Sequence, residues 1–60
     1  MIQEINVDGT LYQVLLTAED DGGFSVSVPE LPGCFTQGET IEEAIAMAKE
    51  AISLYVDSLS

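Results

Sequence analysis

The dipeptide Asp8-Gly9 separates two segments that are rich in Ile, Val, Leu, Thr and Tyr. Asp-Gly is a preferred centre of the two-residue type I′ hairpin, in which both central residues have positive φ. A two-residue loop fixes the pairing of the strands that we expect at about residues 2–7 and 10–19, so that Ile2 faces Leu15. The chain is therefore predicted to begin as an antiparallel hairpin.

A third segment, at about residues 23–28, alternates apolar residues with serines, which predicts a half-buried strand. Its apolar side continues the core face of the hairpin only if the preceding turn has an odd number of residues. We therefore expect Asp20-Asp21-Gly22, or a five-residue equivalent, with a glycine in the left-handed conformation. The predicted core face carries Ile5, Val7, Tyr12, Val14, Leu16 and Ala18, followed by Phe24, Val26 and Val28.

Residues 29–39 contain two prolines and two glycines, which predict a crossing loop with neither a helix nor an internal strand. Thr40 stands three residues before Glu43, the spacing of a capping box in which each side chain accepts a hydrogen bond from the other's backbone amide. A helix should therefore extend over about residues 41–58. Its apolar stripe is predicted to be Ile41, Ala44, Ile45, Ala48, Ile52, Tyr55, Val56 and Leu59.

These elements predict one domain over residues 1–60 of the α+β class, a three-stranded antiparallel meander (βββ) packed on one C-terminal helix. A fold of this size hides only about 60% of the surface of its unfolded chain, so a lone monomer is marginally stable. One cysteine and no histidine leave neither a disulfide nor a structural metal as a remedy. We therefore expect a homodimer or a higher oligomer.

Eleven acidic residues against the single cation Lys49 give a formal net charge of -10. No basic patch can form, so direct binding of nucleic acid is not expected. A basic protein is the better electrostatic partner, although the charge could also serve solubility alone. Neither a signal peptide nor a membrane span is predicted, and the unpaired cysteine fits a reducing cytoplasm.

The side chains offer little for catalysis, since histidine is absent and Cys34 is the only thiol. We expect Cys34 to be buried and unreactive. Glu19, Asp20 and Asp21 form a carboxylate cluster, but they lack the ligand spacing of a calcium loop, and turn aspartates are explained by hydrogen bonds to their own backbone. The sequence predicts no enzyme, no cofactor and no metal site.

Apolar and acidic residues left outside the core are candidates for an interface with a partner or a second copy. On the reverse face of the sheet Ile2 and Leu15 form a small patch. The alternatives are a solvated face for the acidic residues of the helix and the rim of the core for Met47 and Leu54. The first strand also has an open edge that could accept another strand. The candidate interface residues are Ile2, Glu4, Leu11, Leu15, Glu43, Met47, Glu50, Leu54 and Asp57.

The order of motifs along the chain resembles the HicB antitoxin family. A glycine turn and an alternating strand are followed by Pro-x-Leu-Pro-Gly-Cys at residues 29–34 and by Gly-x-Thr-x-Glu-Glu-Ala at residues 38–44. The resemblance covers essentially the whole chain. The residues that define the structural motif are Gly22, Phe24, Pro32, Gly33, Cys34, Thr40 and Glu43.

This resemblance implies a partial RNase H-like fold without its catalytic acids, in a type II toxin-antitoxin system. Family members neutralise HicA, a small basic toxin that cleaves mRNA. Typical relatives continue into a fourth strand beside the first and then into a DNA-binding segment, whereas this sequence stops at Ser60 and resembles a short form. Three hypotheses follow: an antitoxin-like binder acting through the acidic helix face, the loop at 29–38 or the open first strand; an orphan oligomeric HicB-like domain; and an RNase H-like hydrolase.

Overall fold

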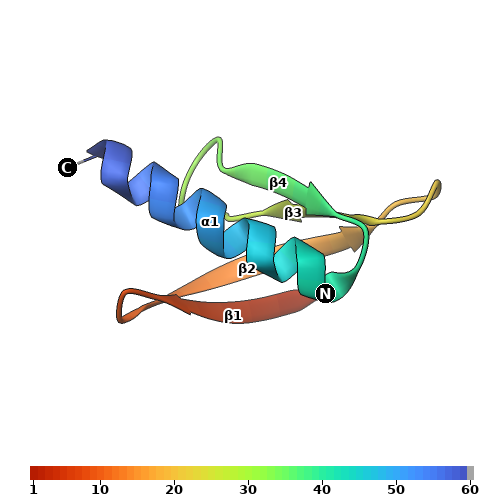
Figure 1. Cartoon of the computed structure of the whole chain (residues 1–60), viewed down its shortest axis with the longest axis horizontal. Coiled ribbons are helices and arrows are strands. Elements are labelled where there is room, and N and C mark those ends of the chain that lie inside the picture. The colour runs from red at the N-terminus through yellow and green to blue at the C-terminus, as the bar shows by residue number, and fades with distance from the viewer. Residues whose placement is uncertain (60) are drawn as a thin grey trace.

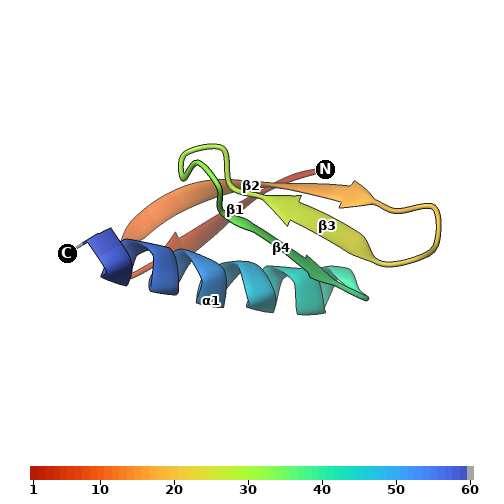
Figure 2. The same cartoon turned by 90° about the horizontal axis from the view of Figure 1, so that it is seen from above.

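One helix lies across one face of a four-stranded antiparallel sheet in the computed structural model, which describes residues 1–59 (Figures 1 and 2). The strands follow each other in the order β1-β2-β3-β4, so β1 and β4 are the two edges. The predicted α+β class is confirmed. The elements are β1 (Ile2–Val7), β2 (Thr10–Ala18), β3 (Phe24–Ser27), β4 (Phe35–Gly38) and α1 (Ile41–Leu59).

The first hairpin has the predicted register, with Ile2 opposite Leu15. Its turn has positive φ at both central residues, 52° at Asp8 and 85° at Gly9, as a type I′ turn requires. The side chain of Asn6 tightens the turn, because its Oδ1 accepts a hydrogen bond from Gly9 N–H at 3.1 Å. Local turn chemistry thus sets which face of β1 and β2 is buried.

The second turn satisfies the predicted parity. Five residues, 19–23, separate β2 from β3, and Leu16 pairs with Val26 on the core face. Glu19 N–H donates to the carbonyl of Gly23 at 3.0 Å. Gly22 and Gly23 both have positive φ, 96° and 83°, which confirms a glycine in the left-handed region.

Strand β4 corrects the prediction of a loop over residues 29–39 and of only three strands. The prolines and Gly33 are confined to two consecutive turns before the strand, in which Leu31 N–H donates to Val28 and Cys34 N–H to Leu31, both at 2.9 Å. These turns reverse the chain, so that residues 35–38 pair with β3. Because β4 is an edge strand, it needs a partner on one side only, and Thr36 lies opposite Val26.

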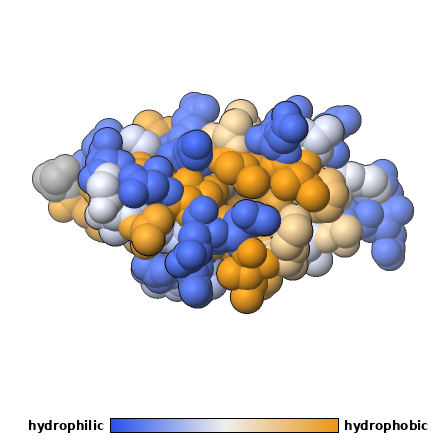
Figure 3. Space-filling view, turned by 90° about the horizontal axis from the view of Figure 1, so that it is seen from below, coloured by the Kyte–Doolittle hydropathy of each residue, from blue (hydrophilic) through white to orange (hydrophobic). Residues whose placement is uncertain are grey.

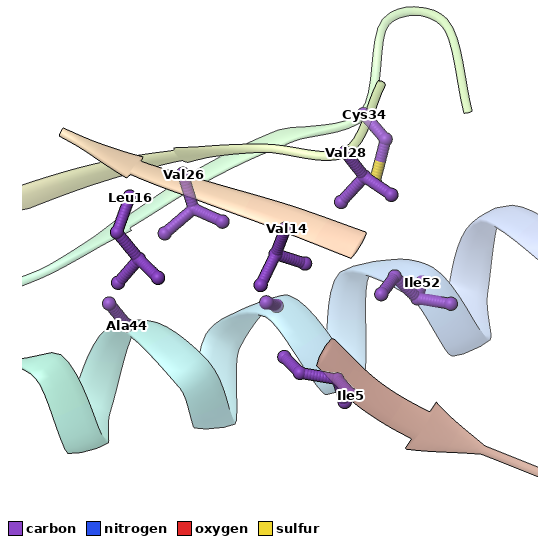
Figure 4. Close-up of a cluster of buried hydrophobic side chains, with 9 residues drawn as sticks. Ile5, Val14, Leu16, Val26, Val28, Cys34, Ala44 and Ile52 are labelled. Carbon is purple, nitrogen blue, oxygen red and sulfur yellow. The ribbon is translucent and has the colours of Figure 1, made fainter. Parts of the chain in front are cut away.

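The core lies between the sheet and three fully buried helix residues, Ala44, Ala48 and Ile52 (Figure 4). They pack against apolar side chains from β1, β2 and β3 and against Cys34. The predicted stripe is too wide, because Ile41, Val56 and Leu59 stay exposed at its margins. A single helix on a small sheet covers only a narrow strip.

The start of α1 confirms half of the predicted capping box. Thr40 Oγ1 accepts a hydrogen bond from Glu43 N–H at 3.0 Å, so Thr40 is the N-cap. The carboxylate of Glu43 accepts from the amide of Glu39 at 3.3 Å, one residue earlier than predicted. The reciprocal bond therefore holds the residue before the cap and joins β4 to the helix.

Candidate protein-binding surfaces

The predicted interface residues are all exposed, but the structure divides them between two opposite faces. Ile2, Glu4, Leu11 and Leu15 lie on the sheet face that α1 does not cover, here called the outer face. The remaining five lie along α1, on the other side of the sheet. These are Glu43, Met47, Glu50, Leu54 and Asp57.

A row of three apolar side chains and one serine crosses the outer face through all four strands, and it is called the apolar row here. Ile2 pairs with Leu15, Leu15 with Ser27 and Ser27 with Phe35. The exposed fractions are 66% for Ile2, 41% for Leu15 and 74% for Phe35. Phe35 was missed by the sequence reasoning because residue 35 was assigned to a loop. Recognition of β4 as a strand would have placed it on this face.

An acidic groove opens between the β2–β3 turn, β4 and the first turns of α1. Four acidic residues are among those that line it, namely Glu19, Asp21, Glu39 and Glu43. Figure 3 shows hydrophilic atoms covering the end of the molecule where the β2–β3 turn lies, with hydrophobic atoms gathered nearer the middle. The sequence predicted Glu43 as an interface residue. Glu19 and Asp21 lie beside it only because the sheet topology brings the turn at residues 19–23 close to the start of α1.

Gly38 shapes this groove by letting β4 and α1 approach each other closely. A Cβ at this position would lie 2.5 Å from the backbone nitrogen of Ala44 and 2.7 Å from its Cα. No side chain fits there without a shift of backbone. The sequence showed Gly38 only as part of a motif, because nothing local demands a glycine at this position.

The loop between β3 and β4 is held to both layers of the fold. Tyr55 donates its hydroxyl proton to the carbonyl of Pro32 at 2.9 Å, and Glu30 Oε1 accepts from Gln13 N–H at 3.3 Å. Cys34 is buried beneath the loop, as predicted, and burial raises the pKa of its thiol. A neutral, shielded thiol is a poor nucleophile.

Within residues 1–59, no group of three His, Cys, Asp or Glu side chains is arranged as metal ligands would be. The same part of the chain has no helix long and apolar enough to cross a membrane. The notable features are therefore two surfaces, the apolar row on the outer face and the acidic groove beside α1.

Residues 12–60 match the HicB-like antitoxins of bacterial toxin-antitoxin systems. The chain belongs to this family. Antitoxin HicB of Escherichia coli K12 is 46% identical to this HicB-like chain over 41 residues, which are 68% of the chain and 30% of that protein. An antitoxin family implies a toxin as partner in general.

Two further relatives are UPF0150 proteins. That of Thermoplasma acidophilum is 54% identical over 48 residues, 80% of this chain and 70% of the relative. That of Synechocystis sp. has the same identity over the same length and is covered to 61%. No solved structure matches the chain.

Proposed function

We propose that this HicB-like domain is an antitoxin module that binds and neutralises a small basic toxin of the HicA type. The observation that carries the proposal is the family match over residues 12–60. The net charge of -10 supports it, because all eleven acidic side chains are exposed and give the surface a negative charge that attracts a basic partner. Charge complementarity of this kind accelerates association and excludes wrong partners.

The acidic groove is the surface that best fits a basic toxin. Glu19 and Asp21 reach it from the β2–β3 turn, and Glu39 and Glu43 from the start of α1. A Lys or Arg side chain that enters the groove meets carboxylates from two elements at once. Arginine in particular forms bidentate hydrogen bonds with carboxylates. The exposed acidic face of α1 extends this surface through Glu50.

A binding experiment with matched variants tests this assignment. Glu19→Gln/Asp21→Asn removes two charges from the groove, whereas Glu4→Gln/Asp8→Asn removes two charges away from it. The titrant is a candidate toxin, a short basic protein encoded in a neighbouring reading frame. We expect the groove variant to weaken its calorimetric binding by about tenfold or more, because charge pairs in a partly desolvated site are lost. Equal weakening by both variants would show that only overall charge matters.

The second candidate is an orphan oligomeric HicB-like domain without a toxin. It is favoured by the UPF0150 relatives, whose names state no toxin or partner although they are 54% identical. The neighbouring reading frame discriminates between the two candidates. A short basic product that binds the chain supports the antitoxin, and the absence of such a neighbour supports the orphan.

The proposed module acts in the cytoplasm as a homodimer or higher oligomer, without direct contact to nucleic acid. Its single lysine and exposed carboxylates support the absence of nucleic-acid binding. Its size supports self-association, since a fold of about 60 residues buries little surface. The RNase H-like hydrolase hypothesis would require RNA cleavage that depends on a metal and is lost in Asp20→Ala or Asp21→Ala.

A further inference from the structure

The outer face is nearly uncharged in a molecule that is otherwise strongly acidic. Among the strand residues of 1–59 that point to this face, Glu4 alone is ionisable, and the others are apolar, hydroxyl or amide side chains. Ten of the eleven acidic residues therefore lie elsewhere, in turns, in the loop after β3 and along α1. This distribution separates a surface suited to cations from a surface suited to a like-charged neighbour.

The apolar row on this face is complementary to itself. Its members are, in order across the sheet, Ile2, Leu15, Ser27 and Phe35. A two-fold axis parallel to the strands, between β2 and β3, would place the row of a second copy over this one in reverse order. Ile2 would then lie over Phe35 of the second copy, and Leu15 over its Ser27. The small serine leaves room for the leucine.

We propose that the outer face binds the same face of a second copy in this arrangement, forming a two-layered sandwich of sheets. The inference rests on the self-association proposed above and is independent of the toxin. It adds the surface and the symmetry of the assembly. Aligned packing of sheets about 10 Å apart is a common way to cover such faces.

The scarcity of carboxylates on the outer face favours a second copy over a basic protein as its partner. Two bodies of net charge -10 repel each other, so they can associate only through a face that keeps carboxylates apart. In the proposed arrangement the two Glu4 side chains lie three strand spacings apart, about 14 Å laterally, which exceeds the Debye length of about 8 Å at physiological salt. A basic toxin would find almost no carboxylate here.

The size of the face predicts a weak dimer. Four strands spaced ~4.8 Å apart and about six residues long give a flat footprint of about 400 Å² per copy, at the low end of specific interfaces. We therefore expect a concentration-dependent dimer with a micromolar dissociation constant. Added salt should tighten it, because salt screens the repulsion between the two copies.

Sedimentation velocity on the full chain tests the face. We expect a dimer at high micromolar concentration for the native chain and for Leu54→Ser, which removes a largely exposed leucine from α1. Phe35→Ser should raise the dissociation constant of the dimer at least tenfold. Because both side chains are largely exposed, at 74% and 62%, neither substitution disturbs the core. A native chain that remains monomeric would overturn the proposal and the predicted oligomer together.

Two further variants distinguish this face from an edge-to-edge dimer. Met1 and Leu16 exchange two backbone hydrogen bonds, and hydrogen-bonded pairs alternate with non-bonded pairs along antiparallel strands. Glu4, opposite Gln13, therefore belongs to a non-bonded pair, and its amide points away from β2. Glu4→Pro thus keeps the β1–β2 pairing and blocks only the addition of another strand at the edge of β1. We expect the dimer to survive Glu4→Pro. A dimer that is lost in Glu4→Pro and kept in Phe35→Ser would overturn the proposed face and leave self-association standing.

Cysteine crosslinking tests the symmetry. A mixture of Ile2→Cys and Phe35→Cys chains should form a crosslinked heterodimer with a bis-maleimide reagent that spans about 10 Å, the spacing of packed sheets, whereas either variant alone should form far less. In the proposed arrangement two copies of Ile2, or two copies of Phe35, lie a further three strand spacings apart, about 14 Å laterally. Preferential crosslinking of Ile2→Cys to itself would contradict the proposed axis.

Discussion

A few single residues determine how closely the sheet and α1 pack against each other. Gly38 ends β4 directly against the backbone of Ala44, and Thr40 caps the helix two residues later. Cys34 fills the core beneath the loop that precedes β4. At this scale the HicB-like motif is explained by contacts: Gly38 leaves room for the helix backbone, Thr40 accepts a hydrogen bond from an amide of the first helical turn, and Cys34 fills part of the core.

The substitution Gly38→Ala should destabilise the fold by about 1–3 kcal/mol, the usual cost of overpacking. The added methyl would meet backbone 2.5 Å away, so either β4 or α1 has to move. Chemical denaturation measures the loss. Gln37→Ala, at the exposed neighbouring position, should change stability by less than about 0.5 kcal/mol. Equal effects of the two variants would show that the close approach of β4 to α1 does not require glycine at position 38.

The buried thiol of Cys34 predicts a decline of stability at alkaline pH. Burial raises its pKa in the folded state above the ordinary value of 9.0, so the folded chain keeps a proton that the unfolded chain releases. This contribution is fully present below pH 9.0, and it is lost as the pH rises from there through the raised pKa of the folded state. Comparison of urea denaturation at about pH 8 and about pH 10 should show a smaller decline for Cys34→Ala than for the native chain. An identical decline would contradict burial as the cause.

Secondary-structure elements show what the sequence could and could not reveal. The hairpin register and the odd turn before Phe24 follow from side-chain alternation and turn chemistry, which are local. Strand β4 was missed because its pairing depends on the turns at Pro29 and Pro32, which act together to reverse the chain. The acidic groove was missed for the same reason, since residues 19–23 meet α1 only through the tertiary fold.

The hydrogen bond between Tyr55 and Pro32 ties the β3–β4 loop to α1, and its loss should weaken both. We expect Tyr55→Phe to lower the free energy of unfolding by about 1 kcal/mol, the net value of a typical hydrogen bond. Tyr12→Phe is the matched control, because the described residues offer its hydroxyl no hydrogen-bond partner. Faster amide hydrogen exchange at Leu31 and Cys34 in Tyr55→Phe alone would locate the effect in the loop. Equal stability of Tyr55→Phe and Tyr12→Phe would show that the hydrogen bond from Tyr55 to Pro32 does not stabilise the fold.

The whole molecule separates charge from apolar surface. The groove and α1 carry carboxylates, whereas the outer face carries an apolar row and one acid. A partner of opposite charge and a second copy of like charge can therefore be held at the same time, on opposite sides of the sheet. This division is what the two proposals require of an acidic chain of 60 residues, one surface for a basic toxin and another for a second copy.

The two proposed contacts should respond to salt in opposite directions. Raising the salt concentration screens attraction to a basic toxin, so binding should weaken, while self-association should tighten as repulsion is screened. Calorimetry and sedimentation over the same salt series measure the two equilibria. Parallel responses would contradict the assignment of the contacts to differently charged faces.

Growth rescue tests the central claim, that this HicB-like domain neutralises a toxin, most directly. A candidate toxin, a short basic protein encoded in a neighbouring reading frame, is expressed in bacteria alone, with the native domain, and with Glu19→Gln/Asp21→Asn. We predict arrested growth with the basic protein alone, restored growth and co-purification with the native domain, and reduced rescue with the groove variant. Arrest that persists with the native domain, without a complex, would contradict the antitoxin function for this pair.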